Sequence, residues 1–226
     1  LHTVNYDVRL LLPERQAWKT AIGTGGMWQR NSNRGDEFLI PGYQLFDIGA
    51  YATSSYKAGD WTLSGGLRLD HRHVHAFALG DLFTRLSRNF TSLSGSIGAV
   101  WHPSGNVNVR LNVARGFRAP NIGELSSNGV HEGTQQYLTG NGSLKAEHSW
   151  QFDAGLDYTS EWLTAQLALY ANFIDNYIYN ARQAGQTREE LPLYSYQSGT
   201  ARLLGGEALI DVHPVRRLHW QNTFSY

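Results

Sequence analysis

The chain has 226 residues and no cysteine, and its 19 basic and 19 acidic side chains give a formal net charge of zero. The absence of cysteine excludes disulfides and thiolate metal sites, and the balanced charge argues against a nucleic-acid partner held through its phosphates. No apolar run reaches the roughly 18 residues that a transmembrane helix needs.

Apolar and polar residues alternate along most of the chain, which is typical of β-strands with two different faces. In segment 61–70 the odd-numbered residues are Trp, Leu, Gly, Leu and Leu, whereas the even-numbered ones are mostly polar. Ten strands are predicted in chain order, at residues 1–12, 16–30, 43–56, 60–75, 89–102, 106–116, 148–158, 162–179, 199–213 and 217–226.

The links between these strands alternate in length. Short links are expected at 13–15, 57–59, 103–105, 159–161 and 213–216, and long ones at 31–42, 76–88, 117–147 and 180–198. Outer-membrane barrels place short turns at one end and long loops at the other, whereas a soluble binding domain has no reason to do so. The sequence therefore predicts an all-β, antiparallel transmembrane β-barrel segment in which every strand pair is antiparallel.

Each predicted surface of this barrel has its own residue types. An aromatic girdle is expected near the short turns, from Trp18, Tyr56, Trp61, Trp101, Tyr158, Trp162 and Trp220. An outward apolar band is expected from Leu63, Leu67, Leu69, Val109, Leu111, Phe152 and Leu156. A polar lumen is expected from Asn108, Arg110, Gln151, Asp153, Asp157 and Asn172.

The most informative stretch follows Arg115. It reads Gly116-Phe117-Arg118-Ala119-Pro120-Asn121-Ile122-Gly123-Glu124-Leu125, and later Gly140-Asn141, Leu144-Lys145, Glu147 and Ser149. This ordered set closely resembles the barrel signature of TonB-dependent receptors, and the blocks 171–179 and 199–207 match the same family in order. The resemblance implies a barrel of about 22 strands around a plug. It identifies residues 1–226 as a partial receptor barrel domain of about ten strands, without the plug domain and the C-terminal strands.

The resemblance also implies a function. We expect a receptor in the bacterial outer membrane for TonB-energised uptake of an iron complex, either a siderophore or haem. Its expected partners are outer-membrane lipids, lipopolysaccharide, the TonB complex through the plug, and a small metal-containing ligand that is cargo and not a prosthetic group. The alternatives are a zinc-uptake receptor of the same family and a passive porin-like or structural barrel. No Ser-His-Asp order or HExxH motif is present, so no enzyme is predicted.

Two sets of residues are candidates for ligand contact. His131 lies in the long loop between the signature blocks, where haem receptors resembling this family often place an axial histidine, and Tyr137 is expected to add a second contact. A weaker metal set is the alternating His71, His73 and His75, because three imidazoles on one face can hold zinc or haem iron. They are odd-numbered like Leu67 and Leu69 and therefore share their outward face, so they are expected at an outward-facing rim.

The signature residues themselves are interpreted as structural. They are expected to fix the loop and not to contact the ligand: Phe117 at the end of a strand, Arg118, Pro120 as a break in strand pairing, and Glu124 as a cap for loop amides.

Overall fold

The computed structural model describes residues 1–34, 38–215 and 217–226. Its ten long strands are β1 (His2–Leu11), β2 (Trp18–Asn31), β3 (Tyr43–Ala58), β4 (Trp61–Ala76), β5 (Leu86–Ser104), β6 (Val107–Arg118), β9 (Glu147–Thr159), β10 (Leu163–Arg188), β11 (Leu191–Val215) and β12 (Leu218–Ser225). The described residues contain no helix that is long and apolar enough to cross a membrane.

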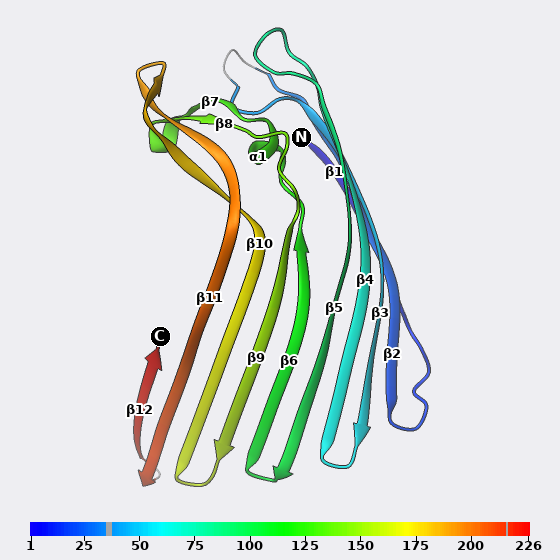
Figure 1. Cartoon of the computed structure of the whole chain (residues 1–226). Helices are drawn as coiled ribbons and strands as arrows, with labels where there is room; N and C mark the ends of the chain where they lie inside the picture. Colours follow the sequence, from blue (N-terminus) through cyan, green and yellow to red (C-terminus); the bar gives the residue numbers. More distant parts are fainter. Residues whose placement is uncertain (35–37, 216) are drawn as a thin grey trace.

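The long strands form one curved sheet in which each strand pairs with its neighbour in the chain (Figure 1). The order runs from β1 to β6 and continues through β9, β10 and β11 to β12. These pairs are all antiparallel, as the alternation predicted. Within the described residues β1 and β12 remain edges, so the sheet is an open wall. The predicted fold class, an antiparallel β-barrel segment, is confirmed.

The two ends of the sheet differ as predicted, with short turns at the lower end in Figure 1 and long connections at the upper end. One long link is an exception. Residues 180–198 were expected to form a loop, but β10 and β11 continue through most of this segment and turn only at Glu189 and Glu190, which have φ angles of 52° and 63°. Two further predicted links include residues outside the described ones, namely 35–37 and 216.

The expectation that every strand pair is antiparallel is wrong for one pair. The loop between β6 and β9 contains two short strands, β7 (Asn128–His131) and β8 (Gln136–Thr139), and β8 pairs in parallel with β11. A parallel pair needs a long crossover, and here β9 and β10 supply it. The extension of β11 beyond its predicted start at residue 199 creates the edge on which β8 pairs.

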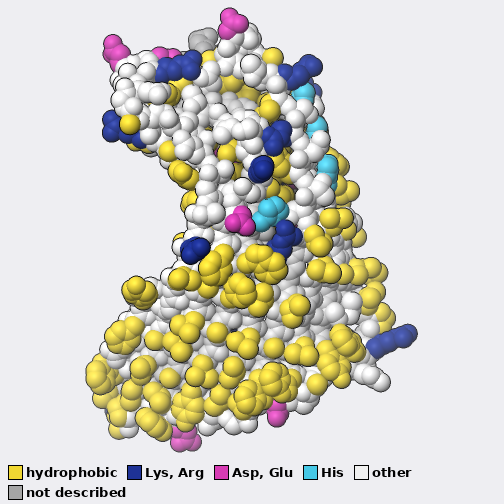
Figure 2. All heavy atoms as spheres, in the orientation of Figure 1, with side chains coloured by type: hydrophobic (Ala, Val, Ile, Leu, Met, Phe, Trp, Pro, Cys, Tyr) yellow, Lys and Arg dark blue, Asp and Glu magenta, His cyan; other side chains and the backbone are white. Residues whose placement is uncertain are grey.

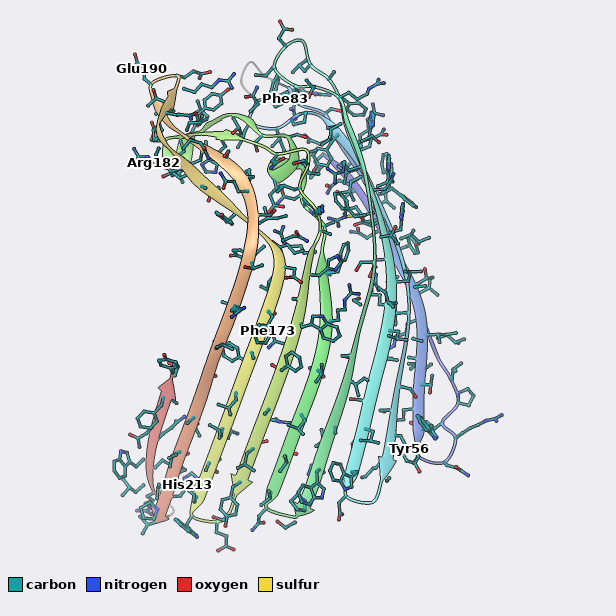
Figure 3. The ribbon with its side chains drawn as sticks, viewed as in Figure 1. Tyr56, Phe83, Phe173, Arg182, Glu190 and His213 are labelled. Atoms are coloured by element: carbon teal, nitrogen blue, oxygen red, sulfur yellow. The ribbon has the colours of Figure 1, made fainter. Side chains whose placement is uncertain are left out.

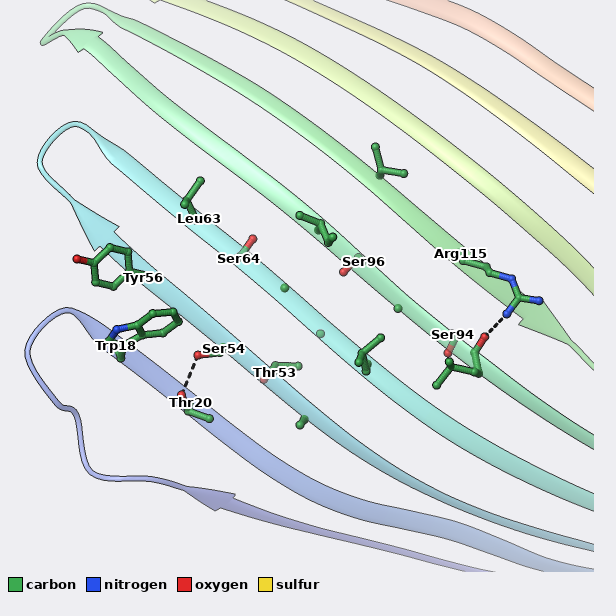
Figure 4. Close-up of a pocket in the computed structure, with 18 of the residues that line it drawn as sticks. Trp18, Thr20, Thr53, Ser54, Tyr56, Leu63, Ser64, Ser94, Ser96 and Arg115 are labelled. Carbon is green, nitrogen blue, oxygen red and sulfur yellow. Dashed lines mark hydrogen bonds between the residues drawn. The ribbon is translucent and has the colours of Figure 1, made fainter.

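The outer face of the wall is apolar. Register places Ala52, Leu67 and Gly95 side by side on this face, and Leu67 is 63% exposed. A hollow of about 710 Å³ on the same face is lined mainly by apolar atoms, including those of Ile97 and of Leu63 and Leu67 from the predicted band (Figure 4). Hydrophobic side chains cover the lower part of the strands in Figure 2. An apolar outer surface of this kind is typical of outer-membrane barrels.

The end of the sheet with the short turns, which we call the turn end, has aromatic pairs on its outer face. The rings of Trp18 and Tyr56 lie 4.7 Å apart, and those of Trp61 and Trp101 stack at 5.3 Å. Such amphipathic rings are typical of the interface between lipid and water.

The inner face is polar and several of its charges are paired. Asn108 and Arg110 both bond Asp157 at 3.1 Å, Asn112 bonds Asp153 at 3.1 Å, and Gln151 bonds Asp153 at 2.6 Å. Higher on the same face, Arg72 pairs with Asp47 at 2.6 Å. The wall is therefore inverted relative to a soluble domain, because its polar groups lie inside the curve.

Within the described residues, a hydrophobic core exists only near the loop end of the inner face. Its buried residues are Tyr43, Leu45, Val74, Ala76, Phe90, Ala119, Ile122, Leu125, Leu144 and Ile178. Strand residues supply six of these ten, and the loop after β6 supplies the other four. Val74 is completely buried because the short helix α1 (Ile122–Ser126) packs against β4.

Candidate functional site

The loop between β6 and β9 spans the inside of the curved wall at its upper end (Figure 1). It contains α1, β7, the 3-10 turn Glu132–Thr134 and β8. On one side the Asn128 amide donates to the Leu39 carbonyl at 3.0 Å, and on the other β8 pairs with β11. The loop therefore joins two distant sides of the sheet at its upper end in Figure 1, which we call the mouth.

Arg118, at the end of β6, fastens this loop at its base. Its Nε and one terminal nitrogen donate to the two oxygens of Glu147 at 2.7 and 2.6 Å. The other terminal nitrogen donates to both oxygens of Glu124 at 2.9 Å. One guanidinium thus ties together the end of β6, the start of β9 and α1, with the bidentate geometry that planar Arg offers and Lys does not.

The two carboxylates have further partners. Glu124 accepts from the Asn121 amide at 2.8 Å while the Asn121 side chain accepts from the Glu124 amide at 2.9 Å, so together they form a capping box at the start of α1. Glu147 accepts from the Ile178 amide of β10 at 2.7 Å. The cluster therefore links four segments of the chain.

Hydrogen bonding to Arg118 and burial shift the pKa of Glu147 in opposite directions. Burial alone raises the pKa of its carboxyl, but the hydrogen bonds from Arg118 and from the Ile178 amide outweigh this effect, and the pKa is lowered below its ordinary value of 4.5. The hydrogen bond to Glu147 likewise raises the pKa of Arg118, against the effect of its burial. Both groups are therefore charged at neutral pH.

The other signature residues surround this cluster. Phe117 packs against the core at the mouth, and its ring lies 6.0 Å from that of His148. Pro120 is fully buried just after β6 ends, where its missing N–H leaves no donor unpaired.

Tyr137 lies inside the loop structure. It is only 1% exposed, its hydroxyl donates to Asn128 Oδ1 at 3.1 Å, and the Arg188 guanidinium lies 4.6 Å from its ring centre. Burial raises the pKa of this phenol. A ring in this position supports the β7–β8 hairpin from inside.

His131 is exposed at the end of β7, where its Nδ1 lies 3.0 Å from Thr134 Oγ1. Register pairs His131 with Gln136 and Val130 with Tyr137. Because successive side chains of a strand point to opposite faces, His131 and Tyr137 lie on opposite faces of the hairpin. The structure does not bring these two candidates together, and the ligand role of each stays a prediction.

His71, His73 and His75 lie on the outer face of β4, opposite to the buried Val74. His71 Nδ1 is 2.7 Å from Thr91 Oγ1, and His73 Nδ1 is 2.7 Å from Asn89 Oδ1. The three rings do not converge on one point. Among the described residues, the group of three possible metal ligands that does converge is Asp211, His213 and His219, at the turn end of the sheet.

Sequence reasoning missed this last group. It assigned residues 213–216 to a turn, whereas β11 continues to Val215. The available signal was the Asp-x-His spacing at 211–213 followed by His219 across a predicted hairpin.

The comparisons with known proteins agree with this architecture. The family model described as "TonB dependent receptor-like, beta-barrel" matches residues 2–226. The chain therefore belongs to the β-barrel family of TonB-dependent receptors, whose members reside in the outer membrane of Gram-negative bacteria. A curated relative, the ferric enterobactin receptor of Pseudomonas aeruginosa, is 31% identical over 99 residues, which are 36% of this chain and 13% of the relative.

Solved structures of the same fold cover the whole wall. The copper transporter OprC matches with a TM-score of 0.80 and 16% identity, over 99% of this chain and 36% of its own. The hemophore receptor of Serratia marcescens, in complex with its hemophore and heme, matches with a TM-score of 0.74 and 19% identity, over 99% of this chain and 40% of its own. The chain thus spans less than half the length of the structures it matches.

Proposed function

We propose that this chain forms part of the wall of an outer-membrane receptor that imports an iron complex, a siderophore or haem, with energy from TonB. The observation that carries the proposal is the loop fixed across the mouth of a wall that is apolar outside and polar inside. A passive pore has no need to bridge its mouth with a charged cluster and a parallel strand pair. The named curated relative, a ferric enterobactin receptor, supports an iron chelate as the ligand class.

The proposed partners follow from the surfaces of the wall. The apolar outer face and the aromatic pairs at its lower end fit outer-membrane lipid, and the residues above the band lie at the level of lipopolysaccharide. The paired charges inside fit a plug domain, through which the TonB complex acts. The metal complex is cargo, held at the mouth from the loop side.

The test is uptake by cells. We would express the full-length protein in a Gram-negative strain that lacks its own receptors for catecholate siderophores and haem, and supply radioactive iron in each form. The proposal predicts saturable uptake of one form that disappears when TonB is deleted. Uptake that is linear in concentration and independent of TonB would contradict it and favour a porin-like barrel, and uptake of zinc alone would favour the zinc receptor.

A further inference from the structure

A second group of polar side chains lies far from the mouth, on the inner face at the turn end of β11 and β12. Asp211 and His213 are two residues apart on β11 and therefore share a face. Register pairs Asp211 with Gln221, which places His219, two residues before Gln221 on β12, on this same face. Figure 3 shows His213 at the lower end of the sheet, beside β12.

The three side chains converge on a small volume. His213 Nδ1 lies 3.4 Å from Asp211 Oδ1, and His219 Nδ1 lies 3.8 Å from Asp211 Oδ2. The two imidazole rings meet edge to face with their centres 4.5 Å apart. One ligand atom from each residue lies within 4.8 Å of the others. In a tetrahedral site, nitrogen and oxygen ligands bound about 2.0–2.2 Å from one Zn²⁺ lie about 3.3–3.6 Å apart, which is close to the 3.4 and 3.8 Å found here.

Two of these polar atoms are buried without a hydrogen-bond partner. Asp211 Oδ1 and His213 Nδ1 are both inaccessible and make no hydrogen bond with any described residue, not even with each other, and each side chain is only 21% exposed. A buried polar atom without a hydrogen-bond partner destabilises a fold. A cation between the carboxylate and the imidazole would satisfy both atoms at once.

We propose that Asp211, His213 and His219 bind a divalent transition metal ion of the zinc class. Two imidazoles and one carboxylate form a ligand set that zinc sites use when they keep a fourth position open to water. Imidazole also suits copper and nickel, whereas a site for magnesium or calcium would be built from oxygen ligands. His219 is 64% exposed, so the ion can enter from that side. This site goes beyond import at the mouth, because it lies at the opposite end of the wall.

The experiment measures zinc bound to the full-length protein, purified in detergent and freed of metal. Wild type is compared with His213→Ala, Asp211→Asn and His219→Gln by equilibrium dialysis at pH 7.5. The matched control is His102→Ala, an exposed histidine that is also at the turn end but outside the cluster. We expect each cluster variant to lose one bound zinc, or to hold it about tenfold or more weakly, since even second-shell changes weaken metal sites by about 10–100-fold. The His102 variant should bind as wild type does.

A second measurement protects the test against a misfolded variant. Cu²⁺ bound to wild type should show an electron paramagnetic resonance spectrum with coupling to two imidazole nitrogens. His219→Gln, a change at an exposed position, should reduce this to one nitrogen. Equal zinc binding by wild type and all three cluster variants, with no change in the copper spectrum, would overturn the proposal and leave the group as an ion pair between Asp211 and the histidines.

Discussion

Arg118 shows how much of the loop position depends on one side chain. Its guanidinium makes four hydrogen bonds to two carboxylates that belong to different elements, α1 and β9. A lysine at this position has one charged nitrogen and cannot bond both carboxylates in the same planar arrangement. The Arg118–Glu124–Glu147 cluster therefore explains the spacing of the signature block, in which an Arg precedes a Glu by six residues.

His131 is the residue whose proposed role can be tested most simply. It is exposed on the loop, and its loss removes only the contact with Thr134. If it is a direct ligand for the metal complex, His131→Ala should weaken binding to the full-length receptor by about tenfold or more, a free-energy loss of about 1.4 kcal/mol. Equilibrium binding of labelled siderophore or haem measures this directly.

His73→Ala is the matched control, because His73 lies on the outer face of β4, where its Nδ1 is 2.7 Å from Asn89 Oδ1. We expect it to bind the metal complex as wild type does. If His73→Ala abolishes binding while His131→Ala leaves it intact, the outer histidines form the site. If neither change matters, the complex is held by other groups of the loops and the protein does not contact the metal.

At the scale of elements, alternation predicted all ten long strands because each has one face in lipid and the other on a polar interior. Alternation did not predict strand segments that have polar residues on both faces. Residues 180–198 are mostly polar and contain Gly185 and Pro192, so the extension of β10 and β11 above the membrane gives no apolar period. Backbone pairing maintains these strands, together with side-chain contacts such as that of Gln183 Nε2 with Ser195 Oγ at 2.6 Å.

The candidate site was predictable only in part, for a similar reason. The signature block marked the loop and the residues at its base, because Pro120 and the Asn121–Glu124 capping pattern are local features. The position of Tyr137 was not predictable, since its burial depends on the hairpin β7–β8 and on Arg188 from β10. Likewise, the Asp211 group requires the register of β11 with β12, which a single sequence does not specify.

The loop should loosen in acid. Glu147 has a lowered pKa, so its ion pair contributes stability that is fully present above the ordinary value of 4.5 and is lost as pH falls through the lower folded value. We expect the amides of Ser127, Gly140 and Asn141, which bond within the loop, to lose protection as pH falls below 4.5, where protection is the exchange rate relative to the intrinsic rate at the same pH. Hydrogen exchange of the full-length receptor in detergent, measured by mass spectrometry between pH 3 and 7, tests this.

Glu147→Gln supplies the control for the acid effect. It removes the charge at nearly constant shape and should accelerate exchange in the loop about 5- to 30-fold at pH 7, which corresponds to about 1–2 kcal/mol. This value is below that of a fully buried pair because Arg118 is 42% exposed. The variant should also lose most of the pH dependence. An unchanged acid response in Glu147→Gln would show that another group controls the loop.

At the scale of the whole molecule, the wall has no continuous core between two layers. Its apolar surface faces outward, its paired charges face inward, and a small core forms only where the loop after β6 packs on β3, β4 and β5. A soluble domain with so many exposed large apolar residues would aggregate, whereas lipid solvates them. The mouth is therefore the one region that is packed like an ordinary globular protein.

The central claim is that this wall spans a membrane. The most direct test is to measure whether exposure to lipid alternates from residue to residue along β4. The chain has no cysteine of its own, so single cysteines at Leu67, Arg68, Leu69 and Asp70 would each carry one spin label in it. In liposomes containing the full-length receptor, labels at Leu67 and Leu69 should collide with oxygen dissolved in the lipid. Labels at Arg68 and Asp70 should be shielded from it, with a period of two residues. Collision rates without this alternation, or equal access of a polar nickel chelate to all four labels, would contradict the membrane-spanning wall.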